Sequence, residues 1–86
     1  MAETVEHYLS RSLIKDDAKG GSGWRSVREV ASVCDLKSPK MPAATRELAA
    51  LETAGKVESA LNGPHLLFRS TMTLAEAREN HPSYIA

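Results

Sequence analysis

The segment from residue 38 to residue 57 limits most strongly what this chain can fold into. It predicts a helix, a tight turn and a strand in direct succession. Ala44, Leu48 and Leu51 recur at spacings of four and three, which places them on one face of an α-helix. This face is the apolar side that the helix would turn toward a core.

Both ends of this predicted helix carry the expected signals. Pro42 suits the first turn, because the N–H that proline lacks would have no partner there. Gly55 follows the last periodic residue, where helices commonly end in a residue with positive φ. The opposite face of the helix is basic and polar, with Lys40, Thr45 and Arg46. A DNA-recognition helix needs this combination of faces, but an ordinary core helix can show it too, so the neighbouring segments must distinguish the two.

The length and composition predict one small domain. Eighty-six residues leave little room for a second core, and an apolar fraction of 42% is ordinary for a globular chain. No apolar run approaches the ~20 residues of a membrane span, and no signal-peptide pattern opens the sequence. Cys34 is the only cysteine, which excludes an intramolecular disulfide and a cysteine-cluster zinc site. We expect a cytoplasmic protein without a membrane segment.

The net charge of zero argues against nucleic-acid binding, but the charge is unevenly distributed. Residues 24–46 carry five basic side chains against two acidic ones, whereas residues 1–23 and 47–86 are both net acidic. The basic segment coincides with the start of the predicted helix. Since phosphate contacts depend on local charge and this excess is small, we expect weak and salt-sensitive affinity.

A first helix is predicted from Thr4, a suitable N-cap, to about Ala18. Its apolar face is formed at a spacing of four by Val5, Leu9 and Leu13. The glycine-rich residues 20–23 then predict a flexible connector. No strand precedes these glycines and no Lys-Ser/Thr pair follows them, which argues against a nucleotide-binding loop.

A second helix is predicted to begin at Val27, because Ser26 and Glu29 have the spacing of a capping box. Its inner face would consist of Val27, Val30, Ala31 and Cys34. Asp35 stands where this helix must turn, and aspartate tolerates the left-handed backbone of such a turn.

Two extended runs, residues 56–60 and 65–70, flank the dipeptide Asn62-Gly63 and predict a β-hairpin. The packed side of this hairpin would consist of Val57, Leu66 and Phe68. A second capping box begins at Thr73 and predicts a short helix to about residue 80. Its thin apolar face is expected to pack on the body or on another subunit. Residues 81–86 are expected to form a loose tail, although Tyr84 and Ile85 could dock.

The order of these elements resembles the winged helix-turn-helix family over residues 24–70. The most specific part is residues 48–57, LAALETAGKV, which is similar to the joint between recognition helix and wing in MarR- and ArsR-like regulators. Residues 27–31, VREVA, also match the first helix of the family's helix-turn-helix. One departure is the spacing between Leu36 and Leu48, which is about three residues longer than is usual for the motif.

The resemblance implies a fold class and a domain organisation. The fold would be α+β and mostly α, with three helices, a β-hairpin wing and a short C-terminal helix. Residues 1–86 would form a single domain with its core at about 24–70. Residues 1–23 would add the N-terminal helix and connector, and residues 71–86 the C-terminal helix and tail.

The resemblance also implies how DNA would be bound. The recognition helix, about residues 40–54, would enter the major groove, and the wing, about residues 56–70, would lie on the backbone or minor groove. The contacts would come from Arg25, Arg28, Ser38, Lys40, Thr45, Arg46, Asn62 and His65. Arg46 would read a guanine edge, while Arg25 and Arg28 would hold phosphate. Each of these charges could equally be a solvated surface residue, and His65 an ordinary strand residue.

Other chemistry has little support in the sequence. His7, His65 and His81 are scattered and lack the spacing of a metal site, so we expect no metal and no cofactor. No nucleophile motif is present, which argues against an enzyme. Cys34 lies on an apolar face and is expected in the core rather than in a redox site.

Two functions from different classes therefore remain. The first is a sequence-specific DNA-binding transcriptional regulator that acts as a homodimer, since one winged helix makes few phosphate contacts and two-fold pairing would add affinity. The alternative is a winged-helix module that binds a protein within a larger complex, which zero net charge and the small side chains at positions 43, 49 and 50 favour. Convergence of the basic residues on one face would favour DNA, and an exposed apolar patch would favour a protein partner.

Overall fold

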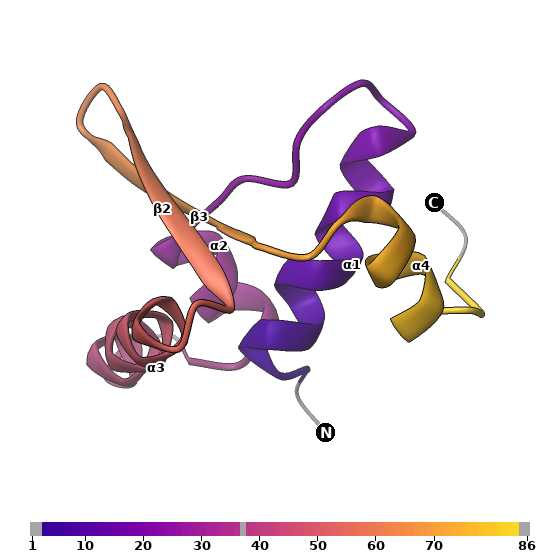
Figure 1. Ribbon diagram of the computed structural model, residues 1–86. Helices are drawn as coiled ribbons and strands as arrows, with labels where there is room; N and C mark the ends of the chain where they lie inside the picture. The colour runs from indigo at the N-terminus through magenta and orange to yellow at the C-terminus, as the bar shows by residue number, and fades with distance from the viewer. Residues whose placement is uncertain (1–2, 37, 85–86) are drawn as a thin grey trace.

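A computed structural model describes residues 3–36 and 38–84 of the chain. It has an α+β fold with four helices and one three-stranded antiparallel sheet (Figure 1). In chain order the elements are α1 (Val5–Asp17), β1 (Arg25–Ser26), α2 (Val27–Val33), α3 (Met41–Thr53), β2 (Val57–Asn62), β3 (His65–Ser70) and α4 (Leu74–Asn80). The four helices and the hairpin were all predicted from the sequence, whereas β1 was not.

The sheet has the strand order β1-β3-β2, so β3 is its central strand. β2 and β3 form a hairpin with a continuous register from Val57, opposite Ser70, to Asn62, opposite His65. β1 adds two residues to the other side of β3, with Arg25 opposite Phe68. This layout of helices, hairpin and short strand is compatible with a winged helix.

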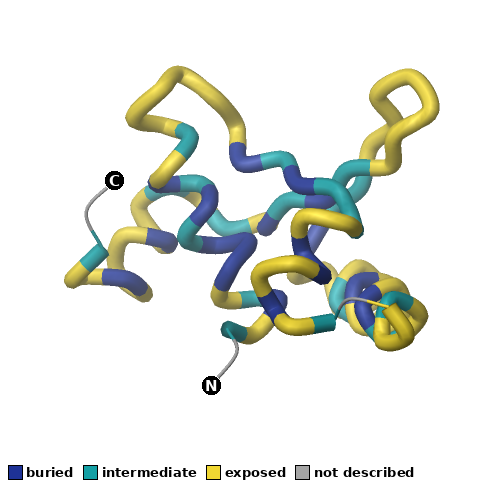
Figure 2. Tube along the Cα trace, turned by 180° about the vertical axis from the view of Figure 1, so that it is seen from behind, coloured by how far each residue is buried: buried dark blue, intermediate teal, exposed yellow. Residues whose placement is uncertain are grey.

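The core lies where α1, α2 and α3 meet the base of the hairpin (Figure 2). Leu9 of α1, Val30 of α2 and Leu48 of α3 are fully buried there. Val57 and Phe68 close the core from the sheet. Because Ala44 is also buried and Leu51 packs against this core, the predicted inner face of α3 is confirmed.

Side-chain caps explain where three of the helices begin. The Thr4 hydroxyl accepts a hydrogen bond from the amide of His7 at 3.1 Å, as expected for the N-cap of α1. Reciprocal capping boxes begin two helices, α2 through Ser26 and Glu29 and α4 through Thr73 and Glu76. These local signals placed the helix starts to within a residue.

Two residues with positive φ end helices at the predicted places. Asp35, with a φ of 56°, lies two residues after the end of α2, and Gly55, with a φ of 75°, lies two residues after the end of α3. Leu36 then packs against the core. The longer turn before α3 includes Lys37, which lies outside the described residues.

The hairpin turn differs from the predicted one. Asn62 is the last residue of β2 and pairs with His65, so the two turn residues are Gly63 and Pro64. Gly63 has a φ of 62° and supplies the positive φ that the sequence predicts for the Asn62-Gly63 dipeptide. The reason is steric, because glycine adopts this conformation without strain and proline accepts the next turn position.

The prediction that Leu66 belongs to the packed side of the hairpin is wrong. Val57 and Phe68 are buried, but 44% of Leu66 is exposed. Leu66 lies on the same face of the sheet as Phe68, since the two are separated by two positions along the strand. It lies beyond the edge of the core, however, because the hairpin extends past the helices into solvent (Figure 2).

The C-terminal segment is better ordered than expected. α4 packs against α1, and Ala77 is fully buried in that contact. The prediction that His81 belongs to a loose tail is wrong, since His81 is only 8% exposed and contacts Ser10 of α1. Residues 85 and 86 lie outside the described part of the chain.

Within the described ranges, 3–36 and 38–84, no helix combines the length and apolarity needed to cross a bilayer.

Candidate nucleic-acid interface

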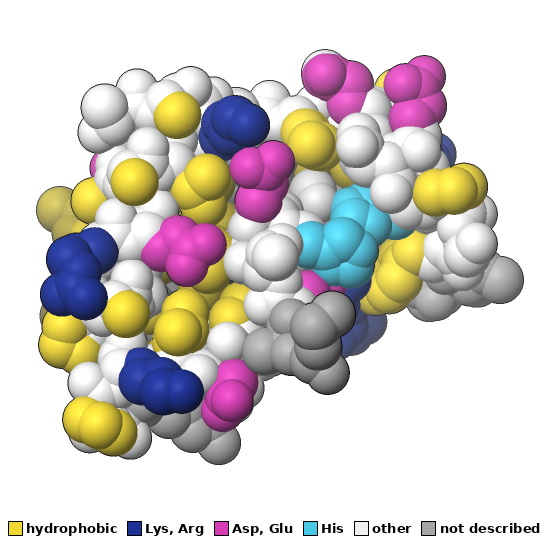
Figure 3. Space-filling view, turned by 90° about the horizontal axis from the view of Figure 1, so that it is seen from below, with side chains coloured by type: hydrophobic (Ala, Val, Ile, Leu, Met, Phe, Trp, Pro, Cys, Tyr) yellow, Lys and Arg dark blue, Asp and Glu magenta, His cyan; other side chains and the backbone are white. Residues whose placement is uncertain are grey.

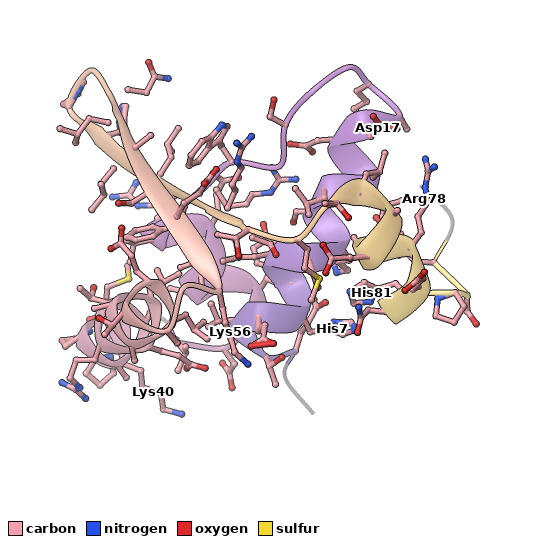
Figure 4. All side chains as sticks on the ribbon, in the orientation of Figure 1. His7, Asp17, Lys40, Lys56, Arg78 and His81 are labelled. Carbon is pink, nitrogen blue, oxygen red and sulfur yellow. The ribbon has the colours of Figure 1, made fainter. Side chains whose placement is uncertain are left out.

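The outer face of α3 presents the side chains that the sequence placed in a DNA groove. Lys40, Thr45 and Arg46 are all exposed, while the inner face of the same helix is held on the core. Lys40 extends from the start of α3 away from the rest of the chain (Figure 4). Neither Lys40 nor Arg46 forms an ion pair with any residue in the described part of the chain. Both charges are therefore available to an external partner.

The N-terminal end of α3 is also open. Lys40 is its N-cap residue, and no side chain hydrogen bonds to the amides of its first turn. Ser38 is exposed in the preceding turn. Because the N-terminal end of a helix carries a partial positive charge, this exposed end adds to the field of Lys40.

Arg28 lies on α2 and is exposed. Its neighbour Glu29 is held by the capping box, where its carboxylate accepts from the Ser26 amide at 3.1 Å. Arg28 also has no ion-pair partner among residues 3–36 and 38–84. It remains a candidate for phosphate contact.

Arg25 does not join this surface. It is 9% exposed, and its guanidinium donates two hydrogen bonds of 2.7 Å to the carboxylate of Asp16 on α1. The same carboxylate accepts from the Gly23 amide at 3.1 Å, and the Arg25 guanidinium holds the pKa of Asp16 below its usual range. The Arg25–Asp16 pair thus holds the glycine-rich connector against α1. Because the charge of Arg25 is already paired, it is not available to bind phosphate.

The tip of the hairpin carries the two remaining predicted contacts. Asn62 and His65 are both exposed and pair with each other across the strands. Figure 1 shows that the hairpin tip and α3 lie on the same side of the molecule, with α1 and α4 on the other. A groove-binding helix and a backbone-binding hairpin need this common side.

Arg69 forms the centre of a small cluster at the base of the hairpin. Arg69 of β3 forms an ion pair with Glu58, the residue opposite it on β2. The Arg69 guanidinium also lies 4.6 Å from the centroid of the Trp24 ring. We expected Trp24 to pack at the hairpin or the first helix, but its contact with Arg69 and the Arg69–Glu58 pair could not be read from periodicity, since the sequence does not show that β1 pairs with β3.

Apolar side chains are exposed on the hairpin as well. Leu61 is 75% exposed, and it pairs directly with the half-exposed Leu66. Val33 on α2 is exposed to a smaller extent. In the view of Figure 3, basic side chains lie among hydrophobic and acidic ones and do not form a continuous basic patch. The surface that could bind a partner is therefore mixed in character.

Other candidate chemistry is limited by burial. Cys34 is buried, and burial raises the pKa of its thiol to about 11, which keeps it protonated and unreactive at neutral pH. Among the described histidine, cysteine, aspartate and glutamate side chains, no group of three is arranged to hold a metal ion.

Comparison of the chain with models of protein families, with curated proteins and with solved structures gave no match. The function must therefore be argued from the arrangement of these surfaces.

Proposed function

We propose that this chain is a winged-helix DNA-binding regulator without enzymatic activity. The observation that carries the proposal is that a two-faced α3 and the hairpin tip lie on the same side of the molecule (Figure 1). One face is fixed on the core through Ala44 and Leu48, and the other exposes Lys40, Thr45 and Arg46. A rigid helix that presents basic and hydroxyl side chains to solvent matches the requirements of a major-groove reader.

Each exposed group has a distinct role in this proposal. Arg46 would read a guanine edge, because its planar fork matches two acceptors, while Thr45 would contact a neighbouring base. Lys40 and Ser38 would bind phosphate at the start of α3, and Arg28 would bind phosphate from α2. The hairpin would serve as the wing, with Asn62 and His65 beside the backbone or minor groove.

The charge of the surface sets the expected affinity. Since Arg25 is neutralised by Asp16, fewer cations remain for phosphate than the sequence predicted. Few phosphate contacts mean weak binding that falls steeply with salt. We therefore include homodimerisation on a palindromic site in the proposal, because a second recognition helix would supply the missing contacts.

The test is fluorescence anisotropy on a mixed-sequence duplex over a salt series, with a Lys40→Ala/Arg46→Ala double variant. Both residues are exposed, so the variant should fold as wild type does. We expect wild-type binding that is micromolar or weaker, with an affinity that falls linearly with salt on a log–log plot. The variant should bind more weakly, and its salt slope should be smaller by about one for each lost phosphate contact.

A matched control removes two charges on the far side of the molecule. Lys15 and Lys19 are exposed at the end of α1 and in the turn after it, so Lys15→Ala/Lys19→Ala lowers the net charge equally without touching α3. The control should keep wild-type affinity. Absence of wild-type binding at low salt would contradict the proposal, and so would an equal loss in the control, which would indicate non-specific attraction.

An alternative function is a winged-helix module that binds another protein. The exposed Leu61–Leu66 pair favours this reading, as do the exposed alanines at positions 49 and 50 on α3. Small and apolar side chains allow close packing against a partner better than they read a groove. The same salt series separates the two functions, since a protein-binding module would leave the duplex unbound under all conditions.

A further inference from the structure

Two histidines far apart in the sequence meet between α1 and α4. The His7 ring of α1 and the His81 ring at the C-terminal end of α4 have centroids 4.4 Å apart, at an interplanar angle of 77°. Figure 4 shows the two side chains pointing toward each other across the gap between the helices. This contact joins the last described segment of the chain to its first helix.

Hydrogen bonds indicate which nitrogen of the His81 ring carries a proton. The Ser10 hydroxyl donates to the backbone carbonyl of His7 at 3.0 Å, so its single proton is used. His81 lies with its Nε2 2.6 Å from the same oxygen and must therefore donate to it. In the neutral imidazole the proton is therefore on Nε2, and Nδ1 is the atom that accepts a further proton when the ring becomes charged.

The surroundings of His81 oppose that second proton. Burial holds the pKa of His81 below its ordinary value of 6.5, and the neighbouring His7 lowers it further. Arg11 on α1 acts in the same direction, whereas Glu3 opposes it. Glu3 is itself shared, because its carboxylate contacts both Arg11 and His7.

Water reaches the pair through an open cavity of about 380 Å³. The other charged groups that face the pair across this cavity are Glu6 of α1, whose carboxylate lies 3.7 Å from the Lys56 amine, and Glu47 of α3. Both carboxylates belong to exposed or half-exposed side chains, so solvent screens them more than it screens the buried His81. Protons from bulk solvent therefore have access to a group that the protein disfavours in its charged form.

α4 has little else to hold it in place. It is seven residues long, shorter than an isolated helix needs for stability, and its buried contact with the body is Ala77. Two other contacts join this segment to α1. One is the Arg78–Asp17 ion pair at 3.3 Å, in which both side chains are at least half exposed, and the other places the Arg11 guanidinium 5.8 Å from the centroid of the Tyr84 ring. Such surface pairs contribute little to stability. The contacts of His81 are therefore a large part of what docks α4.

We propose that His81, with His7 and Ser10, forms a proton-sensitive latch that keeps α4 docked on α1 at neutral pH and releases it in acid. The direction of the pH effect follows from the linkage between proton binding and docking. Because a released His81 binds a proton more readily than a docked one, lowering the pH below the ordinary histidine value favours the released state. For a single proton, the opening equilibrium changes by at most about tenfold per pH unit. The latch does not depend on DNA binding.

The test is amide hydrogen exchange by NMR on the full chain, from pH 7.5 to pH 5, with α3 as the internal reference. Protection factors are corrected for the intrinsic pH dependence of exchange. We expect protection in α4 to fall relative to α3 as the pH falls, with a limiting slope of at most about tenfold per unit. A constant ratio between the two helices over this range would overturn the proposal.

Variants assign the effect to the latch. His81→Gln keeps a side-chain N–H for Ser10 but stays neutral, so α4 protection should lose its pH dependence. His65→Gln removes an exposed histidine of the hairpin and should behave as wild type. Persistence of the wild-type dependence in His81→Gln would overturn the proposal.

A second variant guards against the case in which His81→Gln fails to dock α4 at any pH. His7→Gln keeps the bond between His81 and Ser10 and removes the imidazole that disfavours its protonation. The pH dependence of α4 protection should then become shallower. An unchanged dependence would overturn the role given to the histidine pair. Direct titration of the His81 ring by NMR provides an independent measure, and a midpoint at or above 6.5 would contradict the latch.

Discussion

Arg25 illustrates how a single residue's role depends on a partner that the sequence does not indicate. The resemblance to winged-helix proteins implies a phosphate contact for Arg25, but its guanidinium lies against Asp16, nine residues earlier. The pair has a structural role, since the same carboxylate holds the Gly23 amide and so fixes the connector. Arg46 and Lys40 have no such partner in the described part of the chain and keep their charges for an external contact.

A prediction at this scale concerns the Arg25–Asp16 pair. Asp16→Asn should lower the free energy of unfolding by about 2 kcal/mol, because it leaves the poorly solvated Arg25 charge without its partner. This loss of stability is smaller than that expected for a fully buried ion pair, since both side chains keep some contact with water. Urea unfolding measures the change. Asp17→Asn is the matched control, and its exposed pair with Arg78 should contribute about 0.5 kcal/mol or less.

The same pair predicts a pH dependence with a defined sign. The Arg25 guanidinium lowers the pKa of Asp16, so the pair stabilises the fold above the ordinary value of 3.8 and loses this contribution as the pH falls below it. The difference in stability between wild type and Asp16→Asn should therefore shrink as the pH is lowered from 6 to 3. Equal costs for Asp16→Asn and Asp17→Asn at pH 6 would contradict this account.

Among the elements, the hairpin was predicted correctly as a pair of strands, but its turn was predicted at the wrong position. Two extended runs around a turn dipeptide predicted β2 and β3, and both strands are present. The turn is centred one residue later than predicted, on Gly63 and Pro64, because cross-strand pairing continues through Asn62 and His65. The helices show less ambiguity, since capping boxes mark the starts of α2 and α4 directly.

A prediction at the scale of the element tests the turn. Gly63→Ala should destabilise the protein by about 1 kcal/mol, because alanine tolerates a φ of 62° poorly, although no other atom lies within 4 Å of the added Cβ. Asn62→Thr should change stability by less than about 0.5 kcal/mol, since threonine suits a strand. Thermal unfolding measures both changes. A larger cost for Asn62→Thr than for Gly63→Ala would instead support a turn centred on Asn62.

The whole molecule separates a buried base from an exposed outer part. The core lies at the junction of α1, α2, α3 and the hairpin base, whereas the outer half of the hairpin has no helix beneath it (Figure 2). Phe68 and Leu66 have the same strand parity, but only Phe68 reaches the core. Burial along this strand is therefore set by distance from the helices as well as by the alternation of side chains.

A prediction at the molecular scale follows from this division. Phe68→Ala should lower the free energy of unfolding by about 3 kcal/mol, because it leaves a cavity in the core. A Leu61→Thr/Leu66→Thr double variant should stay within about 0.5 kcal/mol of wild type, because both leucines are largely solvated. Urea unfolding compares the two variants. A cost above about 1.5 kcal/mol for the leucine variant would indicate that the outer hairpin contributes to the stability of the domain.

The sequence by itself determined those features whose signals are local. Helix starts follow from side chains that bond to amides three residues away, and the inner face of α3 follows from a spacing of three and four. The positive φ values of Asp35 and Gly55 were also predictable, because they occur where a helix must end. These features depend on neighbours within about four residues, which the sequence displays directly.

Only the tertiary structure decided which distant residues meet. Four features depend on how the helices and the sheet pack together. They are the strand β1, the Arg25–Asp16 pair, the contact between His7 and His81, and the exposure of Leu66. No spacing in the chain encodes these contacts, because they arise when the whole core closes. The surfaces that we propose for DNA binding and for the proton-sensitive latch both depend on that packing.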